Sequence, residues 1–163
     1  MSDSAQPGPS IRVVRSDEFS ALRRIEFEAA RMFESVGIGP FTNDEDENHF
    51  EQAELVVVVG DPPVGFACVE SVDGNPHIWQ VAVHPDHGRQ GLGRALVEAS
   101  CACGPGLGTL VRSRARHLAT VPWNGPFHQS LGFVTMDTLT PERSAIREHE
   151  RSRGATPSAS GWP

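Results

Sequence analysis

The chain contains no tyrosine, only three cysteines and no long apolar run among its 163 residues. The missing tyrosine removes the phenolic hydroxyl as a proton donor. An odd number of cysteines, with Cys101 and Cys103 two positions apart, does not form a disulfide framework and favours a reducing compartment. No stretch approaches the roughly 18 apolar residues of a membrane-spanning helix, so the sequence predicts no membrane partner.

Positive charge is also scarce, because 14 Lys and Arg face 21 Asp and Glu, for a formal net charge of -7. Nucleic-acid binding depends on Lys and Arg, so this balance argues against a nucleic-acid partner and suits a cationic one. The polar start Met1–Gln6 does not resemble a signal peptide, and we expect a cytoplasmic protein. The length predicts a single domain over residues 11–153, with disordered tails at 1–10 and 154–163 that are rich in Pro, Gly and Ser.

The most informative segment is a buried strand followed by a glycine-rich turn and a helix start, residues 81–97. Glycines let the main chain approach a bulky ligand, and the first N–H groups of a helix attract anions. A P-loop is excluded because Gly91-Leu92-Gly93-Arg94 carries no lysine. A dinucleotide fingerprint is excluded because the glycine spacing runs in the reverse order. The segment therefore predicts a phosphate or pyrophosphate site of another kind.

A second segment follows downstream, with Asn124 before a short helix and Leu131-Gly132-Phe133 after it. Together and in this order, the two segments resemble the coenzyme A motif and the closing region of the GNAT superfamily of acyl-CoA-dependent N-acetyltransferases. The resemblance runs from about Ile11 to about Asp137. It implies acetyl transfer from acetyl-CoA to an amine by direct attack in a ternary complex, without a metal. The acceptor would be a small-molecule amine or a protein amino group, and a homodimer is a candidate state because dimers are common in the family.

The resemblance and the local patterns predict a single α/β (α+β) domain with a mixed, mostly antiparallel sheet flanked by helices. The expected order is strand, helix, optional short helix, three strands, helix, strand, helix, strand, helix. Turn residues after Val59 and Glu70 predict antiparallel hairpins. The expected boundaries are strands at Ile11–Val14, Glu54–Val59, Val64–Glu70 and His77–Val83, a helix capped by Ser16, and a helix from Thr140 to about Arg153.

The resemblance also implies which residues hold the donor. The main chain of Val81 and Val83 would bind the pantetheine arm like an added strand, and the loop amides would hold the pyrophosphate. Gly88 departs from the family, which often has Arg or Gln there. The complete implied coenzyme A set is Val81, Ala82, Val83, Gly88, Arg89, Gln90, Gly91, Leu92, Gly93, Arg94 and Asn124.

The catalytic groups are less clear from the sequence. Many relatives place a tyrosine in the helix before Leu-Gly-Phe, whereas this chain has His128, which we expect to act as the general acid. Trp79 stands where close relatives often have Glu, so Glu70 is the candidate general base, and His77, His84 or a chain of water molecules are the alternatives. These departures leave a second hypothesis open, a non-catalytic acyl-CoA-binding module or an inactive homologue.

The family's fifth strand is weakly encoded. Gly104-Pro105-Gly106 ends the preceding helix, and Arg and His residues interrupt the apolar alternation that follows. We expect the strand at Thr109–Val111 or at His117–Val121. A frame shift over residues 101–117 is one hypothesis for the mismatch. The tail after Gly154 does not resemble a last strand, so the sheet is expected to be one strand short of the family's.

Overall fold

The computed structural model describes residues 8–37, 49–103, 114–115, 122–133 and 138–152. Within them lies one sheet of five strands in the order β1-β2-β3-β4-β5. The first three pairings are antiparallel, and β5 runs parallel to β4. This confirms the mixed, mostly antiparallel sheet. The strands are β1 Ile11–Val13, β2 Leu55–Val59, β3 Gly65–Val72, β4 Asn75–Val83 and β5 Arg114–Ala115.

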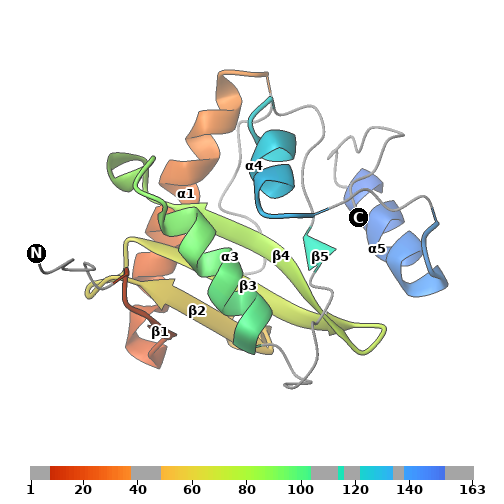
Figure 1. Ribbon diagram of the computed structural model, residues 1–163, viewed down its shortest axis with the longest axis horizontal. Helices are drawn as coiled ribbons and strands as arrows, with labels where there is room; N and C mark the ends of the chain where they lie inside the picture. The colour runs from red at the N-terminus through yellow and green to blue at the C-terminus, as the bar shows by residue number, and fades with distance from the viewer. Residues whose placement is uncertain (1–7, 38–48, 104–113, 116–121, 134–137, 153–163) are drawn as a thin grey trace, which may run out of the picture.

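Helices cover both faces of this sheet, with α1 on one side and α3 on the other (Figure 1). The turn η2 and helix α3 follow β4, and α4 lies beside the start of α3. In the part of the chain that is described, no helix is both long and apolar enough to cross a membrane. The helical elements are η1 Ser16–Glu18, α1 Phe19–Glu34, α2 His49–Gln52, η2 Pro85–His87, α3 Leu92–Cys103, α4 Asn124–Ser130 and α5 Pro141–Ser152.

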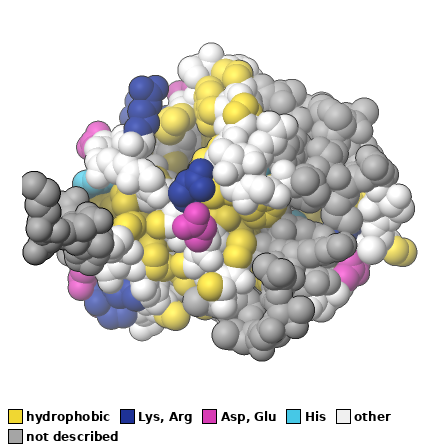
Figure 2. Space-filling view, viewed as in Figure 1, with side chains coloured by type: hydrophobic (Ala, Val, Ile, Leu, Met, Phe, Trp, Pro, Cys, Tyr) yellow, Lys and Arg dark blue, Asp and Glu magenta, His cyan; other side chains and the backbone are white. Residues whose placement is uncertain are grey.

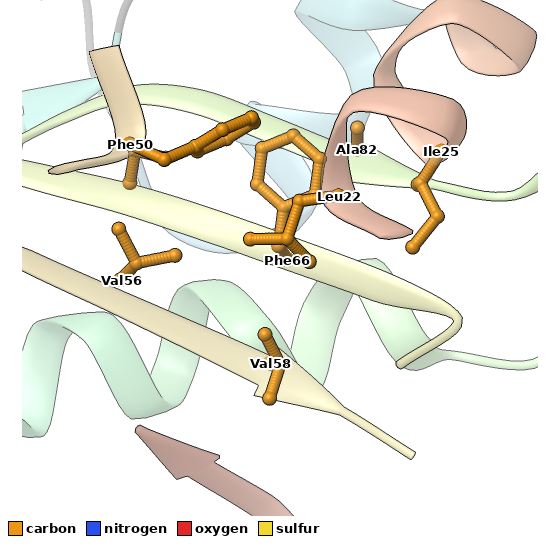
Figure 3. Close-up of a cluster of buried hydrophobic side chains, with 8 residues drawn as sticks. Leu22, Ile25, Phe50, Val56, Val58, Phe66 and Ala82 are labelled. Atoms are coloured by element: carbon orange, nitrogen blue, oxygen red, sulfur yellow. The ribbon is translucent and has the colours of Figure 1, made fainter. Parts of the chain in front are cut away.

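The core on the α1 side is aromatic. The rings of Phe50 and Phe66 are perpendicular with centroids 5.1 Å apart, and Leu22 points into the same cluster from α1 (Figure 3). All three are buried. Perpendicular rings bring a positive edge to a negative face, which stabilises such pairs beyond the area they bury. This cluster attaches α1 and α2 to the sheet.

The core on the α3 side is aliphatic. Leu96 and Val97 of α3 are buried against alternate residues of β2, β3 and β4. Side chains of a strand alternate between its two faces, so the valine run of β2 fills both cores at once. The start of α3 is thereby attached firmly to the strand that precedes it.

Most of the predicted strand boundaries lie within two residues of those observed, but the predicted start of the first α-helix was wrong. The α-helix begins at Phe19 rather than directly after Ser16, because Ser16–Glu18 form a 3₁₀ turn. The Thr140 cap is confirmed, since its carbonyl accepts from the N–H of Ser144 at 2.9 Å.

The described part of the fifth strand falls in neither expected range. The structure describes it at Arg114–Ala115, between the two expected ranges. Periodicity could not locate it, because a two-residue strand has no alternation to detect. Both expected ranges lie outside the described residues, and so does most of the segment for which a frame shift was considered. The strand expected after Phe133 falls on residues 134–137, which are also outside.

An ion-pair cluster attaches the N-terminal strand to the β2–β3 turn. The carboxylate of Glu18 accepts from both terminal nitrogens of Arg12, at 2.8 and 2.7 Å, and from the Arg15 main-chain N–H at 2.9 Å. Asp61 of the turn accepts from Arg15 at 3.0 Å. The hydrogen bonds from Arg12 lower the pKa of Glu18 to about 2 although burial opposes this. The side chain of Glu18 is only 7% exposed.

This cluster makes stability depend on pH. Because the folded-state pKa of Glu18 lies below its ordinary value near 4.5, its contribution is complete above that value and is lost as pH falls towards 2. We expect Glu18→Gln to lower the free energy of unfolding by roughly 2 kcal/mol at pH 7 and to flatten its pH dependence between about pH 5 and pH 2. Urea denaturation across that range measures both. Asp17→Asn, at an 82% exposed side chain, should change stability by less than about 0.5 kcal/mol; equal effects of the two variants would contradict the assignment.

Candidate functional site

A β-bulge in β4 organises the site. Opposite β3, Cys68 pairs with Gln80 and the next residue, Val69, pairs with Ile78, so Trp79 is the extra residue. A bulge bends its strand and sends two successive side chains to the same face. Trp79 accordingly packs against the core on the α1 side, and Gln80 donates to Glu26 of α1. Ile78 and Val81, on either side of the bulge, face the α3 side.

The bulge coincides with the end of the pairing between β4 and β5. In the described residues, β5 pairs only with His77 and Ile78, directly before Trp79. The following half of β4 is paired with β3 on one edge alone. A bulge bends its strand, and the pairing of the described β5 residues stops directly before this bend. Within the described ranges, the end of β4 therefore presents a strand edge that no other strand pairs.

The main-chain direction at this edge follows from one hydrogen bond. The His84 N–H donates to the Val64 carbonyl at 2.8 Å, so the main chain of His84, and of Ala82 two residues before it, faces β3. Groups of successive strand residues point to opposite edges. Val81 and Val83 consequently direct their N–H and C=O groups to the open edge, whereas Ala82 does not. Of the three β4 residues in the implied coenzyme A set, Val81 and Val83 offer main-chain groups to an added strand.

The glycine-rich turn has a main chain suited to anions. Arg89 and Gly91 have φ of +61° and +76°, and Gln90 between them does not have a positive φ. Alternation of this kind turns successive N–H groups towards one point and forms an anion-binding concavity. Gly91 is the natural residue for its position, while Arg89 is held in a conformation that non-glycine residues rarely adopt. The side chains of Arg89 and Gln90 are exposed, and Gly88 has an ordinary extended conformation.

Helix α3 adds further N–H groups. It begins at Leu92, and the Gly91 carbonyl accepts from the Ala95 N–H at 3.0 Å. The N–H groups of a helix's first turn have no partner within the helix, and the helix dipole is positive there. The implied residues Leu92, Gly93 and Arg94 form this turn. They lie directly after the left-handed positions, so the loop and the helix present their amides in one continuous run.

Helix α4 contacts the same turn. Arg94 donates to the carbonyl and hydroxyl of Ser130 at 3.3 and 3.2 Å. A Cβ on Gly93 would lie 3.4 Å from the ring of Phe127. This is an ordinary van der Waals distance, so the Phe127 ring of α4 lies directly beside Gly93. Arg94, a member of the implied coenzyme A set, also joins α3 to α4.

The start of α4 also contacts α1. The rings of Phe33 and Trp123 stack with centroids 6.2 Å apart. Figure 2 shows hydrophobic side chains at the upper end of the molecule, over the end of α1 and the start of α4. Asn124 is the first residue of α4, and its side chain lies outside the described part of the structure.

The two expected catalytic residues occupy different surroundings. His128 is 7% exposed and lies edge-on to Phe127 and Phe133, with centroids 5.2 and 5.5 Å away. Glu70 is an exposed residue of β3, opposite His77 of β4. The structure therefore places them on separate elements, one in an aromatic, buried position and the other at the surface.

A second carboxylate, which the sequence analysis missed, lies over β4. Oε1 of Glu26 accepts from Nε2 of Gln80 at 2.6 Å, and Oε2 lies 3.3 Å from Nε2 of His49. Two features of the sequence indicate this contact. Glu26 follows Leu22 by four residues, which places it on the buried side of its helix. In β4, Ile78 and Val81 are three residues apart instead of the usual two, which indicates a bulge.

The electrostatics of this region are negative. Burial raises the pKa of the Cys68 thiol well above its usual range, and the nearby carboxylates of Glu26 and Glu70 raise it further. Both carboxylates therefore act on the same stretch of the α1 face. No group of three or more metal-ligating side chains occurs in the described ranges.

Comparisons with known proteins agree with this geometry. The family described as "Acetyltransferase (GNAT) domain" matches residues 51–135, just over half of the chain. The match includes the bulged strand, the glycine-rich turn and α4.

Solved structures show the same fold. An acetyltransferase from Thermus thermophilus is 19% identical, with 81% of this chain and 90% of that chain covered and a TM-score of 0.63. The PaiA N-acetyltransferase from Thermoplasma acidophilum, in complex with coenzyme A, is 11% identical, with 94% of both chains covered and a TM-score of 0.63. The ribosomal-protein-S18-alanine N-acetyltransferase from Escherichia coli is 24% identical, with 78% of both covered and a TM-score of 0.58. With its sheet, its bulged β4 and its matched domain, the chain belongs to the GNAT family of acetyltransferases.

Proposed function

We propose that this protein binds acetyl-CoA along the open edge of β4 and transfers the acetyl group to an amine by direct attack in a ternary complex. The observation that carries the proposal is the continuity of two main-chain surfaces. The outward groups of Val81 and Val83 lead directly into the left-handed positions of the loop and the first turn of α3. An extended arm that ends in a pyrophosphate requires this sequence of partners.

The main chain supplies most of the donor's contacts. Val81 and Val83 would bind the pantetheine arm as an added strand, and the amides from Arg89 to Arg94 would hold the pyrophosphate. Side chains contribute less, which fits the presence of Gly88 where relatives often have Arg or Gln. An N–H group at the open edge near the thioester would stabilise the oxyanion that develops during attack.

The proton that the departing thiolate needs would come from His128. Its burial beside Phe127 and Phe133 supports this role, because a buried imidazole is held in one orientation and exchanges little with bulk water. It lies in α4, the helix that contacts the first turn of α3 through Phe127 and Ser130.

The acceptor is an amine, either of a small molecule or of a protein. The net charge of -7 and the carboxylates on the α1 face favour a cationic acceptor over an uncharged one. Cytoplasmic location and a homodimeric state stay predictions. The alternative, an acyl-CoA-binding module without catalysis, is decided by thiol release from acetyl-CoA with a panel of amines. Binding of acetyl-CoA without any release would establish the alternative.

The loop conformation should control donor affinity. Alanine at Gly91 must adopt a φ of +76°, which costs about 1–2 kcal/mol for an L-residue, whereas asparagine tolerates it better. We expect Gly91→Ala to weaken coenzyme A binding about tenfold and Gly91→Asn to weaken it clearly less. Calorimetric titration with coenzyme A gives both constants, and a thermal melt checks folding. Equal affinity of wild type and a folded Gly91→Ala would contradict the proposed cradle.

The role of His128 can be separated from its packing. Phenylalanine keeps an aromatic ring between Phe127 and Phe133 but has no proton to donate, and tyrosine adds a hydroxyl to the same ring. We expect His128→Phe to lower kcat about 100-fold and His128→Tyr to recover a large part of the loss, with coenzyme A affinity unchanged in both. Steady-state assays of thiol release measure kcat. If His128→Phe turns over like the wild type, the histidine is not the general acid.

A further inference from the structure

A polar cluster on the α1 face of β4 has no role in holding the donor. Its members are Glu26 of α1, His49 of α2, and Trp79 and Gln80 of the bulge. Glu26 is in contact with both Gln80 and His49, at 2.6 and 3.3 Å. The ring centroids of His49 and Trp79 are 5.6 Å apart, nearly perpendicular. Three separate elements thus converge on one carboxylate.

The bulge is what brings this cluster to the reaction site. Without the extra residue, Trp79 and Gln80 would point to opposite faces of the sheet. With it, both lie on the α1 face, directly before Val81, whose main chain faces the open edge. Glu26 is hydrogen-bonded to Gln80, and Gln80 directly precedes Val81, whose main chain is proposed to bind the donor.

Two buried polar atoms of the cluster are unsatisfied. The indole N–H of Trp79 and the amide oxygen of Gln80 have no hydrogen-bond partner in the structure as described. Buried polar groups in native proteins are nearly always paired, and leaving one unpaired costs about 1–3 kcal/mol. The two atoms belong to successive residues, and Gln80 also contacts the carboxylate of Glu26, so a polar ligand bound here would give partners to groups that now lack them.

Charge and exposure identify the kind of ligand. The side chains of Glu26 and His49 are 25% and 19% exposed, so the carboxylate is accessible yet surrounded largely by protein. Gln80 carries no charge, and an imidazole is charged only when it is protonated. The indole of Trp79 offers an aromatic face, which attracts ammonium groups. The cluster thus has negative charge that an organic ammonium would balance.

We propose that Glu26 binds the ammonium group of the acceptor and takes its proton, and that His49 passes this proton to solvent. This inference rests on the proposed acetyl transfer. Close relatives often have a Glu in β4 at the position of Trp79. In this chain Glu26 of α1 would supply the carboxylate instead. Gln80 acts as a positioning residue, because its amide holds one carboxylate oxygen and leaves the other towards His49.

One N–H bond of the ammonium breaks as an O–H bond forms on Glu26, which frees the nitrogen lone pair. The nitrogen then forms a bond to the thioester carbon, and the C–S bond breaks with its electron pair leaving on sulfur. The nitrogen loses a second proton, and the thiolate gains one. One proton per turnover is released, through Glu26 and His49, and no oxidant or reductant is needed.

The test compares Glu26→Gln with Glu28→Gln. Glu28 lies on the same helix and has a 34% exposed side chain paired with Arg31, so its substitution removes the same charge elsewhere. Thiol release is measured at about pH 7 with alkyl amines and with their fluorinated, weakly basic analogues, which are largely uncharged at that pH. For the alkyl amines we expect kcat/KM to fall about 100-fold in Glu26→Gln and less than about twofold in Glu28→Gln.

The fluorinated amines distinguish the loss of proton abstraction from structural damage to the acceptor site. They have no proton to lose before attack, so Glu26→Gln should reduce their kcat/KM less than about tenfold. Acetyl-CoA affinity should stay close to that of wild type. Equal losses for both classes of amine, or equal losses in the two variants, would overturn the proposal.

Failure of the acetyl transfer itself is recognised separately. If wild type binds acetyl-CoA but acetylates no amine, the proposed function is wrong, and titration of spermidine onto the coenzyme A complex then tests the ammonium site alone. Binding about tenfold weaker in Glu26→Gln than in Glu28→Gln supports the site. Equal spermidine binding in the two variants rejects it.

Discussion

One extra residue in β4, Trp79, determines most of what this fold can do. The bulge ends the described pairing with β5 at Ile78, and the main chain of Val81 and Val83 faces the edge that is left open. The same residue brings Trp79 and Gln80 to the α1 face. A regular strand would pair along its whole length and would alternate its side chains. It would then offer neither a free edge nor a cluster beside it.

The two faces of the sheet consequently have separate tasks in the proposed reaction. The α3 side holds the turn and the helix start, whose N–H groups are suited to an anionic donor. The α1 side holds the carboxylates of Glu26 and Glu70, which both add to the effect of burial in raising the pKa of the Cys68 thiol. Between them lies β4, which contributes to both. A donor and an acceptor of opposite charge can thus approach one strand from opposite sides.

Stability is concentrated away from this strand edge. Two hydrophobic cores attach α1 and α3 to the sheet, and the Arg12–Glu18–Asp61 cluster attaches β1 to the β2–β3 turn. At the other end, Asp73 at the tip of the β3–β4 hairpin accepts from Thr140 and from the buried Arg143 of α5, at 2.6 and 2.9 Å. These hydrogen bonds lower the pKa of Asp73. β4 is therefore supported at its beginning by α5 and at its end by α3, which leaves the stretch between them to carry the site.

The sequence by itself determined the family, the antiparallel strands and the position of the glycine-rich turn. These depend on local patterns such as alternation, turn residues and glycine spacing, which need no distant partner to be recognised. Only the tertiary structure decided that Glu26 lies against Gln80, that His128 is buried in contact with two phenylalanines and that Gly93 lies beside Phe127. These contacts join residues far apart in the sequence or depend on how a helix packs, and their physical cause is the packing of α1 and α4 around a bent strand and the helix that follows it.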